Sequence, residues 1–488
     1  MTLPFVPGAG RTGSSPGRLP APARRAAGEP RLVPGTELVG EFEGSGYRDP
    51  PQLVCRPDGQ LVRLPGLLYQ VVRALDGRHE GRRDGHHDGH HDERAAARRP
   101  GDEAGSTGTG KDAPGGGSVM TRVADELSRE TGRRFTAEHV AYLIDEKLAP
   151  LALTTYSDGS PPPPARRSDP FLAFRFRLAV LPERVTWFVS GLFAWLFHPL
   201  AVYLAVCVFV VGETWVWASP ETVTALQAVL TAPGSVLLVV FLAIASCVFH
   251  EWGHGAACRY GGVRPGAMGC GIYLVWPAFY TDITNSYRLG RAGRIRADLG
   301  GVYFNALFVL GLLGLYAATG FQPLLVAIVA VNLEIVQQLL PTLRFDGYYI
   351  VADLVGIPDL FSYIGPILKR VLLRRPADER LRALKRWPQI VVACWVLCLI
   401  PVLLLQVGIL LLNLPRLLAA DWRKAQWLLE NAGASGHQIL GTVSACLQIV
   451  LLALPIAGLL LALVRPTRSL LRFLGRKAGL SGEASPGT

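Results

Sequence analysis

The stretch Ser246-Cys-Val-Phe-His250-Glu251-Trp-Gly-His254-Gly-Ala256 lies inside an apolar run from about Val236 to Ala257. On an α-helix, two histidines four residues apart share one face and lie about 6 Å apart along the axis. Both imidazoles can therefore bind one metal ion, and imidazole nitrogen suits Zn²⁺. Glu251 directly follows the first histidine, so its carboxylate could accept a proton from a water that the metal activates.

The apolar setting of this HExxH motif favours a metal site. An ionisable residue such as Asp or Arg near the centre of a bilayer costs about 2.5–3.5 kcal/mol, and such residues usually have a function. The competing interpretation is a polar cluster that lines a helix interface.

Composition indicates a polytopic membrane protein with a polar soluble part. The 488 residues are 50% hydrophobic, and their net charge of +11 is concentrated between the apolar blocks. The residues before about Pro50 lack an apolar signal-peptide core, so we expect a cytoplasmic amino terminus. The eight cysteines are scattered without CxxC spacing, which predicts reduced thiols, no disulfide framework and no thiolate zinc site.

Hydropathy predicts about six membrane spans, since each needs about 20 mostly apolar residues. The candidates are 187–212, 234–257, 299–319, 323–341, 389–412 and 439–464. The loops 259–297 and 342–388 are rich in Lys and Arg, whereas 213–233 has neither. By the positive-inside rule both termini are cytoplasmic, with HExxH near the cytoplasmic end of the second span. The basic loops could also contact lipid headgroups or nucleic acid, but topology explains them with fewer assumptions.

The amino-terminal third predicts a small domain. Residues 1–48 resemble a disordered linker, and 49–155 contain a hairpin around Asp58-Gly59 followed by helical patterns at 67–75, 119–130 and 136–147. A final Leu-Ala-Leu strand would complete a winged-helix pattern. The insertion 78–118 contains a DGHHDGHHD tract, which indicates a disordered segment or one that collects metal.

This region resembles the peptide-recognition domain of pyrroloquinoline-quinone biosynthesis and other modified-peptide pathways, in "LVCRPDGQLVRLPGLLYQVVRALDG" and "VADELSRETGRRFTAEHVAYLIDEKL". The resemblance implies that a leader peptide adds a strand at the edge of the sheet. Two alternatives are a DNA-binding helix-turn-helix using Arg133 and Arg134, and a plain structural domain. Nucleic acid is disfavoured because acidic residues dilute the basic face. A Pro-rich linker at 156–185 would precede the membrane domain at 186–465, with a basic cytoplasmic tail at 466–488.

Three further stretches supply residues that HExxH lacks. Asp346 follows the fourth predicted span and offers a third ligand that would leave a position open for water; the alternative is a turn Asp before Gly347. Asn305 ends Gly300-Gly-Val-Tyr-Phe-Asn305, where it could orient a substrate carbonyl or join two helices by a hydrogen bond. The strand-like stretch 271–282 could present an edge to an extended substrate, and Asp282 would then serve as a loop cap.

HEWGH, GGVYFN and LLPTLRFDGYY together resemble the site-2 protease family of intramembrane zinc metalloproteases, and more narrowly the peptide zinc metalloproteases of bacterial peptide-modification clusters. The resemblance covers about 186–465. It implies that His250, His254 and Asp346 bind zinc, that Glu251 is the catalytic base, and that Asn305 positions the substrate.

The sequence therefore predicts a mainly α protein: a helical membrane domain of about six spans with a small amino-terminal winged-helix domain. Its expected function is zinc-dependent endopeptidase activity near the cytoplasmic face of a bacterial plasma membrane. The substrate would be a membrane protein or a small, ribosomally made modified peptide. The alternatives are a non-hydrolytic membrane protein that binds peptides or assists their export, and a membrane-tethered regulator.

Overall fold

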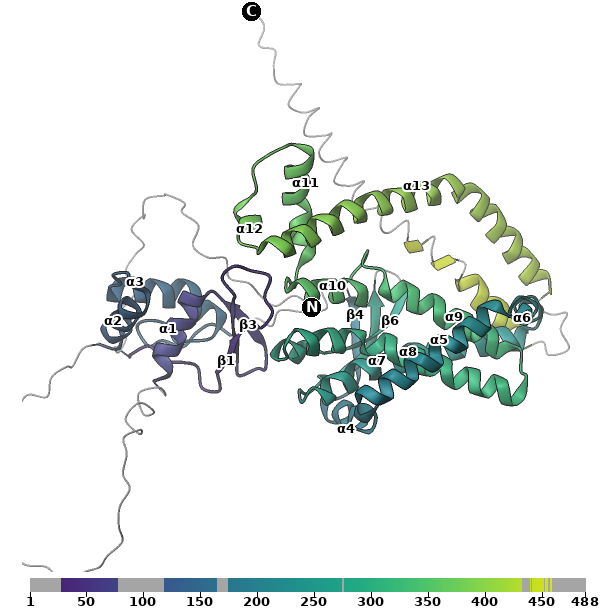
Figure 1. The fold of residues 1–488 in the computed structure, drawn as a ribbon, viewed down its shortest axis with the longest axis horizontal. Coiled ribbons are helices and arrows are strands. Elements are labelled where there is room, and N and C mark those ends of the chain that lie inside the picture. Colours follow the sequence, from purple (N-terminus) through teal and green to yellow (C-terminus); the bar gives the residue numbers. More distant parts are fainter. Residues whose placement is uncertain are drawn as a thin grey trace, which may run out of the picture. The chain divides into compact units, whose positions relative to one another are not determined.

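The computed structural model describes residues 28–77, 118–164, 174–273, 276–431 and 441–451, together with positions 439, 453, 454, 457 and 458. The chain forms two compact units. The first, here the small unit, contains Leu3–Glu41 and Asp49–Ser168; the second, here the helical unit, contains Phe42–Arg48 and Asp169–Thr488. As predicted, the fold is mainly α, with two small sheets (Figure 1).

In its described residues, the small unit combines a three-stranded antiparallel sheet with three α-helices. Its strands, in the order β1-β2-β3, are β1 (Glu37–Glu41), β2 (Gln52–Cys55) and β3 (Leu61–Leu64). Its helices are α1 (Gly66–Asp76), α2 (Val119–Thr131) and α3 (Ala137–Leu143), and a π-helical turn Ile144–Leu148 extends the last. The predicted hairpin is present: Cys55 pairs with Leu61, and Gly59 has the positive φ of 81° that its tight turn requires.

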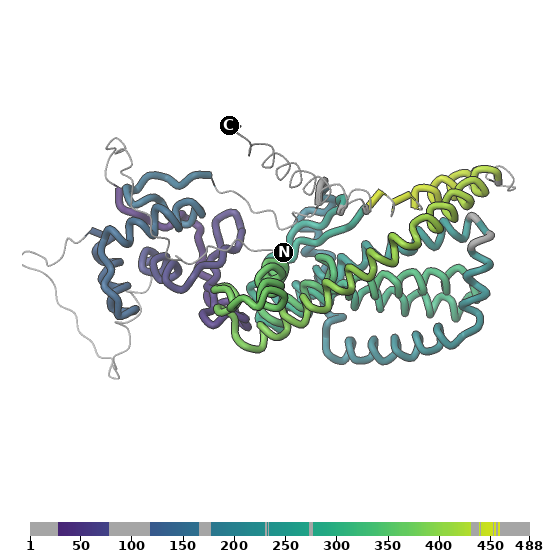
Figure 2. The backbone as a smooth tube through the Cα atoms, turned by 90° about the horizontal axis from the view of Figure 1, so that it is seen from above, coloured from purple at the N-terminus to yellow at the C-terminus, as the bar shows by residue number. Residues whose placement is uncertain are grey.

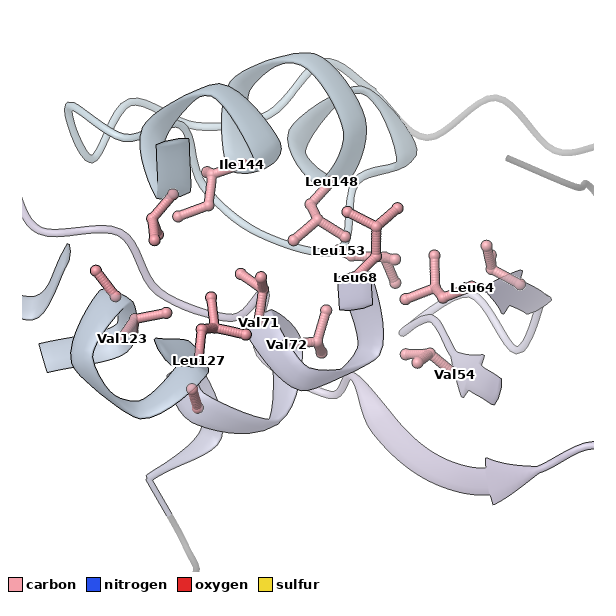
Figure 3. Packing of buried hydrophobic residues seen from close by; sticks show 14 residues of the cluster. Val54, Leu64, Leu68, Val71, Val72, Val123, Leu127, Ile144, Leu148 and Leu153 are labelled. Carbon is pink, nitrogen blue, oxygen red and sulfur yellow. The ribbon is translucent and has the colours of Figure 1, made fainter. Parts of the chain in front are cut away.

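One apolar cluster holds the small unit together, because each helix contributes a buried stripe at helical spacing. Val71 and Val72 of α1 face Val123 and Leu127 of α2, and Ile144 closes the cluster from the third helical segment (Figure 3). Thr136 begins α3 by accepting a hydrogen bond from the backbone N–H of His139, which satisfies one amide that the helix itself leaves free.

Two expectations for this region need correction. Strand β1 lies inside the segment 1–48 that was predicted to be linker, and it pairs with β2. The expected closing strand at Leu151-Ala-Leu153 does not form, since Ala149–Leu151 is a 3₁₀ turn and Ala152 has a φ of 57°. Leu153 instead packs into the core. The His-rich tract of the predicted insertion lies outside the described residues, and so do residues 1–27 and the predicted basic tail.

The described part of the helical unit consists mainly of α-helices. Those that precede the HExxH motif or contain it are α4 (Glu183–Phe193), α5 (Pro199–Ala218), α6 (Pro220–Thr231) and α7 (Pro233–Tyr260). The later ones are α8 (Arg291–Thr319), α9 (Pro323–Leu339), α10 (Asp346–Val355), α11 (Ile364–Leu372), α12 (Glu379–Arg382) and α13 (Arg386–Asn431). Helix α8 packs against α5, α7 and α9 (Figure 2).

Four of the described helices are long and apolar enough to cross a membrane: Pro199–Ala218, Gly234–Tyr260, Arg291–Thr319 and Arg386–Glu430. The pair Asp346–Val355 and Leu360–Leu372, bent by 69°, would make a fifth. The first span begins later than the predicted 187–212, because Pro199 has no N–H to donate and therefore starts a new helix. Helix α9, predicted to span at 323–341, has only 17 residues. Of the sixth predicted span, 439–464, the described part contains the short apolar helix Gly441–Leu451.

A second antiparallel sheet, in the order β4-β5-β6, lies in the helical unit. Its strands are β4 (Phe174–Leu181), β5 (Met268–Tyr273) and β6 (Trp276–Thr281). The strand-like stretch predicted at 271–282 is thus part of a hairpin. Strand β4 corrects the prediction that 156–185 is all linker: its alternating sequence FRFRLAVL pairs with β5.

We predict that Leu127→Ala destabilises the small unit by about 2–5 kcal/mol, because it leaves a cavity in the buried cluster. Hydrogen–deuterium exchange of the full-length protein should then show faster exchange across α1, α2 and α3. The control Tyr142→Ala removes a side chain that is 57% exposed and should leave these rates unchanged. Equal exchange in the Leu127 variant and the wild type would contradict the assigned core.

Candidate metal centre

Helices α7 and α8 meet at backbone distance beside the HExxH motif. A Cβ on Gly253 would lie 2.1 Å from the carbonyl oxygen of Gly300, and a Cβ on Gly300 would lie 2.6 Å from that of Gly253. Only glycine permits this approach, as is common where membrane helices cross. The next residue, Gly301, lies against both histidines: a Cβ on Gly301 would lie 2.3 Å from His250 Nε2 and 2.6 Å from His254 Nε2.

Three predicted ligands come together against this glycine: His250, His254 and Asp346. The two Nε2 atoms are 3.1 Å apart, and Asp346 Oδ2 lies 3.1 Å from His250 Nε2 and 3.5 Å from His254 Nε2. For zinc bound at about 2.0–2.1 Å in tetrahedral geometry, neighbouring ligand atoms lie about 3.3 Å apart. The triangle therefore has the size of one face of a zinc coordination tetrahedron, and the donor set fits the metal.

The orientation of His254 supports the same interpretation. Its Nδ1 lies 2.7 Å from the backbone carbonyl oxygen of Ala297 on α8. A carbonyl only accepts, so Nδ1 carries the proton and the neutral ring presents the Nε2 lone pair to the triangle. Both histidines are buried, with exposed fractions of 3% for His250 and 6% for His254.

Asp346 reaches the histidines because the chain turns tightly after α9. It is the first residue of α10, and a Cβ on the next residue, Gly347, would lie 2.1 Å from the carbonyl oxygen of Leu339. In the Asp-Gly pair, Asp346 thus supplies the candidate ligand, and Gly347 allows the backbone to lie close to that of Leu339. No described group donates a hydrogen bond to Asp346 Oδ2, which is buried and faces the two Nε2 atoms.

Glu251 lies on the same helix as the histidines but differs from them in being partly exposed. Its backbone carbonyl accepts a 3.0 Å hydrogen bond from Thr281 Oγ1, which ties the end of β6 to the HExxH turn. Asp282, the next residue, caps its loop by accepting hydrogen bonds from the backbone and side chain of Thr284. The hairpin β5-β6 therefore lies beside the helix that carries Glu251, and Asp282 has the structural role that sequence reasoning allowed.

Asn305 is fully buried in α8. Its Oδ1 accepts a 3.3 Å hydrogen bond from Ser246 Oγ of α7, whereas its Nδ2 has no acceptor among the described residues. The amide therefore joins α7 to α8. Sequence reasoning missed Glu334, whose carboxylate lies near the Cys247 thiol, His250 and the Asn305 amide. The available signal was that Glu334 is the single ionisable residue of the apolar helix α9.

Among curated proteins, the chain is similar to "Putative peptide zinc metalloprotease protein YydH" of Bacillus subtilis (strain 168). The two are 26% identical over 126 residues, which make up 25% of this chain and 50% of that protein. The chain thus matches about half the length of this relative. No protein-family model matches the chain. No solved structure matches it either.

We predict that Gly301→Ala abolishes stoichiometric metal binding, because its methyl group would occupy the space between the two Nε2 atoms. Alanine favours a helix over glycine by about 1 kcal/mol, so loss of the helix would not explain the result. Zinc content should be measured in purified protein whose tract histidines, His79, His86, His87, His90 and His91, are replaced by serine.

The matched control is Gly311→Ala on the same helix, where an added Cβ meets nothing within 4 Å. This control should retain about one zinc per chain, as expected for a single centre. Full zinc occupancy in the Gly301 variant would show that the metal binds elsewhere.

Proposed function

We propose that this protein is a membrane-embedded zinc metalloendopeptidase. The observation that carries the proposal is the triangle of the buried His250 and His254 with Asp346, next to the partly exposed Glu251. Two imidazoles and one carboxylate leave a fourth position of a tetrahedral zinc open, as in hydrolytic sites. The similarity to a relative named as a peptide zinc metalloprotease supports the same chemistry.

Zinc held by these three residues would polarise a peptide carbonyl and lower the pKa of a water molecule from about 15.7 towards 7. The carboxylate of Glu251 would accept the proton of the attacking water and deliver it to the leaving amine nitrogen. Asn305 would donate a hydrogen bond from Nδ2 to the substrate, since Nδ2 makes no hydrogen bond of normal geometry to a described residue, with the Glu334 carboxylate only nearby. The carbonyl of Ala297 would keep His254 in the binding tautomer throughout.

The substrate of this site would be an extended peptide. Hydrolysis requires an exposed carbonyl, so a helical substrate has to unwind before it reaches Glu251. The hairpin β5-β6 adjoins the HExxH turn through Thr281, and an edge strand can pair with an incoming extended chain. A leader peptide bound at the small unit, and a position of the centre near the cytoplasmic face, are further parts of the proposal.

We predict that Glu251→Gln retains zinc and loses peptide hydrolysis, because the amide keeps the shape of the side chain but cannot accept the proton. Loss of a general base typically lowers the rate about 10²–10⁴-fold. Cleavage of a quenched-fluorescence peptide library in detergent micelles would measure activity, and elemental analysis would quantify both zinc and iron.

Glu183→Gln, at an exposed position of α4, is the matched control and should cleave at the wild-type rate. His254→Ala and Asp346→Ala should lose zinc as well as activity. Wild-type cleavage by the Glu251 variant would refute the proposed mechanism. Bound zinc without cleavage by the wild type would instead favour a protein that binds peptides without hydrolysing them.

A second prediction concerns Asn305. Asn305→Ala should lower kcat/KM by about 10-fold or more, because each good hydrogen bond to the reacting substrate contributes of order 1–3 kcal/mol. Zinc content should remain unchanged, since the side chain hydrogen-bonds to Ser246 and is not itself one of the three ligands. The control Ser246→Ala removes the hydroxyl that donates to Asn305 Oδ1 but keeps the Asn305 side chain. An unchanged kcat/KM in the Asn305 variant would leave the amide with its interhelical role alone.

A further inference from the structure

A seven-residue segment, Phe42–Arg48, belongs to the helical unit although the strands on either side of it belong to the small unit. It lies between β1, which ends at Glu41, and β2, which begins at Gln52. Its residues are packed like a core: Phe42 is fully buried and Ser45 is 3% exposed. We call residues 42–48 the inserted segment.

The first contact of the inserted segment is with Arg294, a fully buried arginine near the start of α8. A buried charge costs several kcal/mol unless it is paired and hydrogen-bonded. Arg294 donates to Asp353 Oδ1 at 3.1 Å, to the Leu289 carbonyl at 2.9 Å and to the Glu43 carbonyl at 3.0 Å. The Phe42 ring lies 4.3 Å from the guanidinium carbon, so the inserted segment supplies both a hydrogen bond and a cation–π contact.

The second contact is with the carboxyl end of α10. The backbone N–H of Gly46 donates to the Gly356 carbonyl at 3.1 Å, and a Cβ on Gly46 would lie 2.2 Å from the Val355 carbonyl oxygen. Gly356 ends the helix with a φ of 69°, and a Cβ there would lie 2.2 Å from the Gly44 carbonyl oxygen. Lys385 also binds the inserted segment: its backbone N–H donates to the Gly46 carbonyl, and its Nζ donates to the Ser45 carbonyl.

These contacts involve α8 and α10, the helix that orients His254 and the helix that Asp346 begins. Arg294 is three residues before Ala297, whose carbonyl orients His254. Its partner Asp353 is on α10, the helix that Asp346 begins. The Arg294–Asp353 ion pair therefore links α8 to α10, and the inserted segment completes the coordination of the arginine that makes the link.

We infer that the inserted segment, residues 42–48, is a positioning element of the metal centre, because it fixes α8 against α10 and so sets the distance of Asp346 from the two histidines. The inference rests on the proposed metal centre. It also makes the functional part of the helical unit discontinuous in sequence, since this part includes residues that precede the small unit's second strand.

Two independent changes test the inference in the full-length protein with its tract histidines replaced by serine. In the first, an Asn-Gly turn replaces residues 42–51 and joins Glu41 to Gln52, which already pair across β1 and β2. This change leaves every membrane helix intact. In the second, Arg294→Met removes the link itself.

The matched control is Arg56→Met, which removes another buried arginine, 4% exposed, from its ion pair with Asp58 in the small unit. Zinc affinity would be measured by competition with a chelator, and the absorption spectrum of the Co²⁺-substituted protein would report ligand geometry. Circular dichroism of the metal-free proteins would verify that the helices persist.

Both changes should weaken zinc binding at least about 10-fold, as loss of groups that orient metal ligands does, and both should alter the Co²⁺ spectrum. The Arg56 control should match the wild type in affinity and spectrum. Wild-type affinity and spectrum in the turn variant would overturn the inference, even if Arg294→Met unfolds. Failure of the wild type to bind zinc would overturn the proposed metal centre and the inference with it.

Discussion

The close contact between α7 and α8 is the constraint on which the rest of the helical unit depends. Because Gly253 and Gly300 have no Cβ, the two backbones touch, and Gly301 then lies against the imidazoles of His250 and His254. The same contact brings the Ala297 carbonyl within 2.7 Å of His254 Nδ1. A side chain larger than hydrogen at these glycines would separate the helices, and the geometry of the histidine pair would be lost.

Several polar groups in the apolar helices are paired across helix interfaces, as burial requires. Glu213 of α5 accepts hydrogen bonds from Asn332 of α9 and from Trp217 of its own helix. Tyr316 of α8 donates to Glu221 of α6. Such pairs hold the bundle together where apolar surfaces alone would not specify a partner. At the metal centre, Asn305 Nδ2 and Asp346 Oδ2 have no hydrogen-bond partner among the described residues, which is costly in a purely structural site.

The two structural units are not continuous in sequence. Residues 42–48 contribute a buried phenylalanine and two close-packed glycines to the helical unit, although they lie within a stretch that sequence reasoning assigned to linker. Such a stretch has no apolar period, because its residues pack as an irregular loop and hydrogen-bond through backbone carbonyls. Strand β4 escaped prediction for a related reason: its partner, β5, is about ninety residues away.

By itself, the sequence determined the local features: the helical hydrophobicity of the spans, the hairpin turn at Asp58-Gly59, and the shared face of His250 and His254, because each depends on neighbours within a few residues. Only the tertiary structure decided that Asp346 Oδ2 lies 3.1 Å from His250 Nε2 and that Arg294 links α8 to α10. It also decided that Gly301 lies where any side chain would block the ligand atoms. These relations join segments far apart in the chain, and their distances depend on how whole helices pack, which no local pattern encodes.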